Sequence, residues 1–173
     1  IANTACAIAA IRNLKKYKIK DEDIINGIKS IQNQRGRLEK LTKGPLKDLA
    51  PSNTIICDIA HNPDAACALS KYLSTLSKNK EIYIICGMME NKIHKKFLSN
   101  FKYVKEIIAI DIPNNTNCIK KDSLKKIIEK IGIKSCTSNS IQAAIKYVSN
   151  KDSNSIILIV GSIYLIGEVL NLN

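Results

Sequence analysis

Residues 54–63 read TIICDIAHNP, and this stretch contains a transition from a strand to a helix. Its first residues are mostly β-branched and apolar, which is typical of a short buried strand. Asn62 is a favourable N-cap and Pro63 a favourable first residue of the helix that follows. We therefore expect Asp58 and His61 at the carboxyl end of a strand, beside the unpaired N–H groups that begin a helix.

The same alternation of strand and helix continues outward from this stretch. The patterns predict further strands at 81–86, 106–110, 134–136 and 155–160, and helices at 63–76, 92–101, 123–131, 140–148 and from 163 onward. The helix near 123 is expected to be capped by Asp122 or Ser123. Short strands that alternate with helices of about ten residues indicate βαβ crossovers. We therefore predict an α/β fold, a Rossmann-like three-layer domain with a mostly parallel sheet.

The N-terminal part of the chain follows a different pattern. Small residues predict a helix over residues 1–14, and isoleucines at helical spacing predict a second over about 23–31, with acidic residues at its start. The polar sequence QNQRGR at 32–37 has no periodicity, so it reads as a connector. Arg37 lies on that connector, where it either reaches a neighbouring domain or is an ordinary surface arginine.

Two other strand ends carry residues that could meet a ligand. Gly161 and Ser162 follow the last strand, where glycine permits close approach and a hydroxyl can both donate and accept. Gly87 ends the second strand of the alternating region, before a loop with a Met pair that is more often packing than function. Ligands of open α/β sheets bind outside the carboxyl ends of the strands. The alternative is that Ser162 only caps its helix and His61 only bonds to backbone.

Charge and composition narrow the classes of function. The net charge is +12, but only three of the 27 basic residues are arginines, and the chain has no Trp. Because the lysines are spread along the whole chain, we interpret the charge as a solvated surface that attracts acidic substrates, and we expect no nucleic-acid partner. The apolar runs are far shorter than the ~20 residues of a membrane span, so no membrane partner is expected.

Cysteine usage points to a reducing compartment. The six cysteines form no C-x-x-C pair, and there are only two histidines, so no metal site is expected. Reduced thiols predict a cytoplasmic location. The sequence has no G-x-x-x-x-G-K-[ST] loop. Because it begins with Ile1, we expect that it either starts inside a longer protein or follows a processing or cloning boundary.

In order along the chain, several motifs resemble those of folylpolyglutamate and dihydrofolate synthases, which belong to the Mur ligase superfamily. They are Asn3 before an Ala-rich helix, Gly36-Arg37-Leu38-Glu39, Asp58-x-Ala60-His61-Asn62-Pro63, Gly87-Met88 with Lys92, and Gly161-Ser162. Ile59 stands where the muramyl-peptide ligases tend to have Tyr, which favours the folate branch. Arg35 replaces the usual Pro, and Asn91 and Ile93 replace the usual acidic neighbours of Lys92.

The resemblance implies three regions and a ligase. Residues 1–32 would be a helical remnant of the ATP-binding domain, 33–52 a connector, and 53–173 the C-terminal glutamate-ligase domain. The activity implied is ATP-dependent addition of L-glutamate to dihydropteroate or folate through an acyl phosphate. ATP and Mg²⁺ would be the cofactors, with the metal ligands on the missing N-terminal domain or on a separate chain that supplies it. Folate, L-glutamate and ATP would be the small-molecule partners.

The resemblance also implies roles for five residues. Asn3 would lie near the adenine, Arg37 would contact the triphosphate, and Asp58 would meet the ribose or the attacking amine. His61 and Ser162 would position the glutamate, so the implied catalytic set is Arg37, Asp58 and His61. The alternatives are a non-catalytic remnant, a module that binds nucleotide or glutamate, or another Mur-type amino-acid ligase. Such a chain would come from a split enzyme, an excised domain or a decaying gene.

Overall fold

The structure is a computed structural model that describes residues 2–31, 34–76 and 80–173. The chain forms two compact units, which divide between Gln34 and Arg35. The predicted boundary between residues 32 and 33 falls on residues outside those described, so the predicted division into domains stays a prediction.

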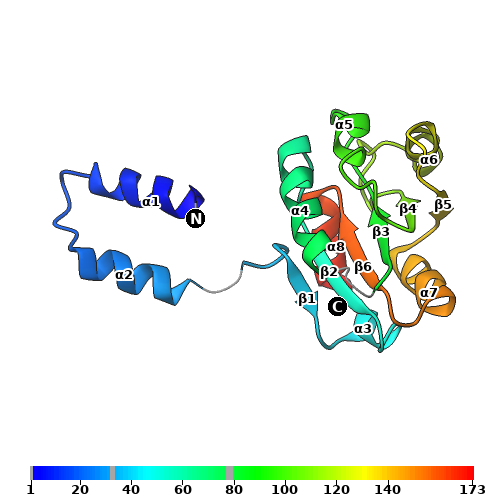
Figure 1. Cartoon of the computed structure of the whole chain (residues 1–173), viewed down its shortest axis with the longest axis horizontal. Coiled ribbons are helices and arrows are strands. Elements are labelled where there is room, and N and C mark those ends of the chain that lie inside the picture. Colours follow the sequence, from blue (N-terminus) through cyan, green and yellow to red (C-terminus); the bar gives the residue numbers. More distant parts are fainter. Residues whose placement is uncertain (1, 32–33, 77–79) are drawn as a thin grey trace. The chain divides into compact units, whose positions relative to one another are not determined.

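The second unit contains a six-stranded sheet with helices on both faces (Figure 1). The strand order is β1-β2-β6-β3-β4-β5, and β1 alone among these strands is antiparallel to its neighbour. The strands are β1 (Glu39–Leu41), β2 (Thr54–Asp58), β3 (Ile82–Cys86), β4 (Glu106–Ile110), β5 (Ser135–Ser138) and β6 (Ile156–Val160). The helices are α3 (Pro45–Asp48), α4 (Pro63–Leu76), α5 (His94–Leu98), α6 (Lys121–Lys130), α7 (Ile141–Lys151) and α8 (Ile163–Leu172). The predicted α/β fold with a mostly parallel sheet is confirmed.

The two faces of the sheet are covered by different helices. Because side chains alternate along a strand, Ile55 and Cys57 pack on one face with α3, α7 and α8, whereas Ile56 packs on the other with α4, α5 and α6. The same alternation holds along β3 and β6. The unit is therefore three layers thick, with an apolar core on each side of the sheet.

Strand β6 lies between β2 and β3, although it comes last in the chain. The chain leaves β2 and β3 for helices on one face and leaves β6 for α8 on the opposite face. Adjacent strands whose helices diverge in this way form a topological switch point, where the sheet opens a crevice at its carboxyl edge. Asp58, Cys86 and Val160 end these three strands side by side.

The first unit consists of two helices, as predicted. They are α1 (Ala2–Arg12) and α2 (Asp21–Ser30), and three acidic residues occupy the first turn of α2, where the helix dipole favours negative charge. That these helices remain from a preceding domain is still a prediction. Across the described parts of both units, every helix is too short or too polar to span a bilayer.

Several predicted boundaries were wrong, and long-range contacts explain why. Helix α6 begins at Lys121, so neither Asp122 nor Ser123 caps it; the Asp111 carboxylate accepts a hydrogen bond from the Lys121 N–H at 2.7 Å. Helix α5 is shorter than predicted: it begins at His94, after a turn at residues 90–92, and backbone bonds tie Met88 and Glu90 of the preceding loop to residues 117–119. Strand β1 and helix α3 lie within the stretch that reads as a connector.

Replacing Lys151 with Met should destabilise the chain by about 2–3 kcal/mol, because it leaves a buried carboxylate short of its cation. Lys151 donates to Glu106 at 2.6 Å, and Glu106 is only 2% exposed. The hydrogen bond to Glu106, and a second one to the hydroxyl of Tyr147, raise the pKa of Lys151. Because the pKa of Lys151 is higher in the folded chain than in the unfolded chain, the charged lysine stabilises the fold. This stabilisation is complete at neutral pH and is lost as the pH rises from ~10.4, the unfolded value, through the folded pKa. Urea unfolding at several pH values measures both effects.

The control is Lys105→Met, which removes an exposed ion pair with Glu81. That substitution should cost less than about 1 kcal/mol. Equal losses for the two variants, or a loss that does not shrink in strong alkali, would contradict the role assigned to the Glu106–Lys151 ion pair.

Replacing Gly161 with Ala should destabilise the chain by at least about 2 kcal/mol. Gly161 has φ +120°, and a Cβ there would lie 2.6 Å from the carbonyl oxygen of Gly87. The matched control is Gly167→Ala within α8, where a Cβ meets nothing within 4 Å. That change should stabilise by up to about 1 kcal/mol, since Ala is the better helix former. Similar unfolding midpoints for both variants would show that the contact of Gly161 does not constrain the fold.

Candidate functional site

A cleft of about 220 Å³ opens at the carboxyl ends of β2, β3 and β6. Its volume is below the ~300–1,000 Å³ of pockets for drug-sized ligands, so it suits a ligand about the size of an amino acid. Residues that follow the three strands, in two loops and at the start of α8, line it: His61, Met89, Asn91, Lys92, Ser162, Ile163 and Tyr164. The predicted residues His61 and Ser162 therefore lie in one cleft, at the switch point of the sheet.

His61 is fixed by the turn that joins β2 to α4. Its Nδ1 lies 3.0 Å from the carbonyl oxygen of Ile59, and a carbonyl can only accept, so Nδ1 carries a proton. In the neutral imidazole, Nε2 then has a lone pair with which to accept a hydrogen bond. Asn62 caps α4 as predicted, because its Oδ1 accepts from the N–H of Ala65 at 2.9 Å. The turn thus holds a half-buried imidazole in a defined tautomer.

Ser162 is the N-cap of α8, and it also lines the cleft. Its hydroxyl oxygen accepts a hydrogen bond from the N–H of Tyr164 at 3.2 Å. A hydroxyl that accepts one hydrogen bond still has its own proton to donate. The capping role that the sequence offered as an alternative is therefore present and compatible with ligand binding. Although the residue as a whole is only 1% exposed, it lies at the start of a ten-residue helix, whose positive end favours an anion.

Lys92 supplies a cation to the cleft, on the loop between β3 and α5. This loop is held by backbone bonds from Ile119 N to Met88 O and from Glu90 N to Asn117 O, and His94 Nε2 lies 2.9 Å from the carbonyl oxygen of Met89. The sequence identified Lys92 within a motif but assigned it no role. The pattern predicted Lys92 as the first residue of a basic helix, and this gave no sign that it would line a cleft.

Asp58 does not line the cleft; it holds two neighbouring turns. Its Oδ1 accepts from the N–H of Ala60 at 2.8 Å, and its Oδ2 accepts from the N–H of Leu38 at 2.9 Å. Arg37 lies next to that second contact, with an exposed side chain. The structure therefore places Asp58 and Arg37 together, beside β2 and outside the residues that line the cleft.

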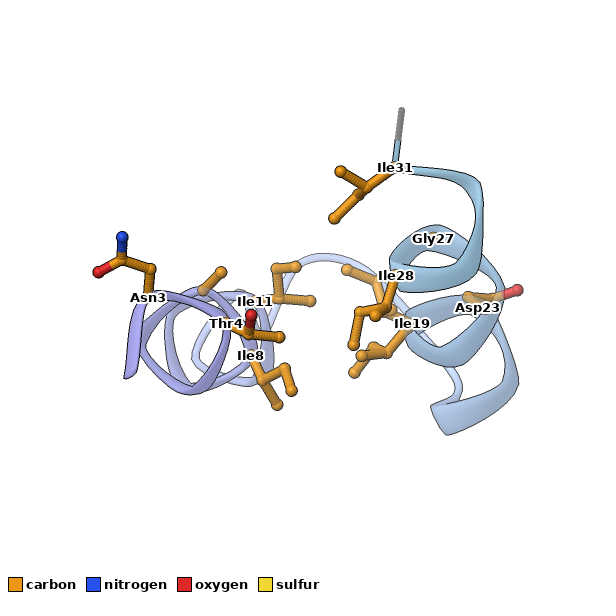
Figure 2. Close-up of a pocket in the computed structure, with 11 residues that line it drawn as sticks. Asn3, Thr4, Ile8, Ile11, Ile19, Asp23, Gly27, Ile28 and Ile31 are labelled. Carbon is orange, nitrogen blue, oxygen red and sulfur yellow. The ribbon is translucent and has the colours of Figure 1, made fainter. Parts of the chain in front are cut away.

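Asn3 lies in the first unit, on α1. With Thr4 and Asp23 it is one of the polar residues among those that line an otherwise apolar groove of about 410 Å³ between α1 and α2. Figure 2 shows isoleucines of both helices facing this groove, whereas the amide of Asn3 points away from α2. Its predicted place near an adenine stays a prediction.

Thiol and metal chemistry receive no support from the described residues. All six cysteines are free, and burial raises the pKa of both Cys57 and Cys86 to about 12, so these two stay protonated at neutral pH. Within residues 2–31, 34–76 and 80–173, no three side chains among His, Cys, Asp and Glu gather to hold a metal ion.

The chain is similar to curated ligases over nearly its whole length. It is 26% identical to UDP-N-acetylmuramate–L-alanine ligase of Clostridium acetobutylicum, covering 96% of this chain and 37% of that protein. It is 25% identical to a dihydrofolate synthase/folylpolyglutamate synthase of Buchnera aphidicola, covering 99% of this chain and 39% of that protein. The chain therefore spans less than two fifths of the length of these relatives.

Solved structures share its fold. Escherichia coli FolC in complex with DHPP and ADP has a TM-score of 0.77 and 23% identity, over 98% of this chain and 38% of the other. Mycobacterium tuberculosis folylpolyglutamate synthase complexed with ADP has a TM-score of 0.76 and 18% identity, over 96% and 38%. These structures show the shared fold, and with the Buchnera aphidicola relative they confirm the predicted resemblance. The family model described as "Mur ligase, glutamate ligase domain" matches residues 36–163, so this chain belongs to the Mur ligase family and contains its glutamate ligase domain.

Proposed function

We propose that this chain is the glutamate-binding part of an ATP-dependent ligase that adds L-glutamate to dihydropteroate or to a folate. The observation that carries the proposal is the cleft at the switch point, where His61, Lys92 and Ser162 meet from three separate strand ends. A cation, a hydroxyl and an imidazole with an accepting nitrogen match the groups of an amino acid.

The chemistry of the cleft complements glutamate. The ammonium of Lys92 and the positive end of α8 favour carboxylates, and the hydroxyl of Ser162 can donate to one of them. Nε2 of His61 can accept a hydrogen bond from the substrate's amino group. An amine must lose a proton as it forms an amide, and a neutral imidazole is suited to take that proton. The cleft would therefore orient glutamate by its carboxylates and present its amine.

The reaction proceeds through an acyl phosphate, by analogy with the family. The γ-phosphoryl group of ATP moves to a carboxylate oxygen of the folate substrate, which leaves ADP and a mixed anhydride. The glutamate nitrogen then attacks the acyl carbon, the bond to the phosphate oxygen breaks, and inorganic phosphate departs with that electron pair. Holding the amine in line with the acyl carbon removes much of the entropic barrier.

Arg37 is proposed to contact the triphosphate, Asp58 the ribose or the amine region, and Asn3 the adenine. A guanidinium stabilises the charge of a transferring phosphoryl group without any rearrangement at the moment of reaction. Mg²⁺ is proposed to bind ligands outside this chain. The sequence has no P-loop motif, and the chain spans about two fifths of the length of its relatives, so turnover should require an ATP-binding half, fused or separate. We call the combination of this chain with that half the complete ligase.

A second candidate, ligation of another amino acid to a muramate-type acceptor, is favoured by the 26% identity to the Clostridium acetobutylicum enzyme. The amino-acid cleft would serve the same purpose there. The two candidates differ in acceptor and amino acid, so parallel assays with L-glutamate and with L-alanine separate them.

The complete ligase should release phosphate from ATP and Mg²⁺ only when both a folate or dihydropteroate and L-glutamate are present. Arg37→Ala should lower kcat by roughly a hundredfold, the scale of losing one preorganised charge donor. The matched control is Lys40→Ala, which removes an exposed cation on β1, three residues after Arg37. No phosphate release with a verified ATP-binding half would refute the proposed function, and an unchanged rate in Arg37→Ala would show that Arg37 is only a surface residue.

Replacing Lys92 with Ala should raise KM for glutamate by roughly 10- to 100-fold, since it removes a charged partner of a carboxylate. Lys95→Ala, at an exposed position on α5, is the control and should leave KM within about twofold. Initial rates over a range of glutamate concentrations measure both. A KM equal to wild type in Lys92→Ala would remove the cleft from glutamate binding.

A further inference from the structure

Arg37 lies in a turn whose backbone is unusual on both sides. Gly36 has φ +72° and Leu38 has φ +47°. The left-handed region is uncommon for a leucine and costs of the order of 1 kcal/mol, so other contacts must hold it there. Gly36 also packs closely, because a Cβ at that position would lie 2.8 Å from Cγ2 of Ile166. The turn therefore has one conformation that its surroundings impose.

Two carboxylates hold the two amides that flank Arg37. The N–H of Gly36 donates to Oε2 of Glu39 at 2.6 Å, and the N–H of Leu38 donates to Oδ2 of Asp58 at 2.9 Å. The carbonyl oxygen of Gly36 accepts from the N–H of Ile59 at 2.9 Å. Hydrogen bonds to ionised acceptors are roughly twice as strong as neutral ones, so these contacts fix the backbone on each side of Arg37.

The carboxylates are themselves held by the sheet. Glu39 begins β1 and is paired with Cys57 of β2, and its Oε1 accepts from Nε of Arg35 at 2.7 Å. Asp58 ends β2 and is also bonded to the N–H of Ala60. Both negative charges lie beside Cys57 of β2, because Glu39 pairs with it and Asp58 follows it in the strand. Burial above all, and then these two charges, raise the pKa of Cys57 to about 12.

Acidic side chains beside a phosphate-contacting arginine need an explanation, because their charge repels phosphate. Here their oxygens point at backbone N–H groups, which offset that charge locally. In return, the backbone from which the long side chain of Arg37 extends is fixed, which limits the positions that its many rotamers can reach. A misplacement of about 1 Å in such a group can cost a hundredfold in rate.

We propose that Glu39 is a positioning residue, which holds the Gly36–Leu38 turn together with the hydrogen bond from Leu38 to Asp58 and so directs Arg37 toward the phosphates. This inference rests on the proposed function, in which Arg37 contacts the triphosphate. Glu39 acts through Arg37 and touches no substrate. It should therefore affect the chemical step and leave glutamate binding, which belongs to the cleft, unchanged.

The test is a double-mutant cycle in the complete ligase with Glu39→Ala and Arg37→Ala. Glu39→Ala should lower kcat roughly 10- to 100-fold, with KM for glutamate within about twofold of wild type. In the Arg37→Ala background, the further loss should be less than about twofold, because the arginine to be positioned is gone. Glu39→Gln should recover most of the rate, since an amide oxygen still accepts from Gly36. Losses that multiply, or a KM that rises as kcat falls, would overturn the proposal.

Glu81→Ala is the matched control, because it removes an exposed carboxylate that pairs with Lys105, and it should keep the wild-type rate.

Hydrogen exchange at the Gly36 amide in the same protein gives a readout that does not depend on turnover. Glu39→Ala should speed that exchange at least about tenfold, and unchanged exchange would overturn the positioning role. A third result separates the two proposals: kcat is unchanged in Arg37→Ala, but Gly36 amide exchange is faster in Glu39→Ala. Arg37 would then have no role at the phosphates, whereas Glu39 would still be shown to hold the turn.

Discussion

The carboxyl end of β6 sits between the ends of β2 and β3, and close backbone contacts keep it there. Gly161 donates to the carbonyl oxygen of Ala60 on one side, and a Cβ on it would meet the carbonyl of Gly87 on the other. Gly87 in turn donates to Val160 at 3.4 Å. Everything proposed about the site depends on this junction, because it brings loops far apart in the sequence to one edge. Only a residue without a side chain fits between two backbones this close.

One short turn connects the two parts of the proposed site. Asp58 ends β2 and holds the turn of Arg37, while His61, three residues later, lines the amino-acid cleft. The arginine proposed to contact the phosphates and the histidine proposed to meet the amine would thus both be held by the carboxyl end of β2. The rigid sheet keeps their separation fixed, as the transfer of an acyl group from phosphate to amine requires. The ion pair of the buried Glu106 with Lys151 lies at the opposite, amino-terminal edge, where β4 begins.

Local features were predictable from sequence, and long-range ones were not. The apolar β-branched run of β2 and the Asn62 cap of α4 depend on neighbouring residues, so their patterns are visible in the chain. The insertion of β6 depends on which strands pair in three dimensions. The capping of α6 by Asp111 and the hold of Asp58 on Leu38 join residues ten and twenty positions apart. Lys92 reaches the cleft because residues 117–119 fix its loop, and no local pattern reports that.

The central claim is that the cleft between the ends of β2, β3 and β6 binds the incoming glutamate. The most direct measurement is a crystal structure of the complete ligase with a non-hydrolysable ATP analogue and L-glutamate. The account predicts glutamate in the cleft, with a carboxylate within hydrogen-bonding distance of Lys92 or Ser162 and the amine near Nε2 of His61. Glutamate bound elsewhere, with the cleft filled only by water, would contradict it.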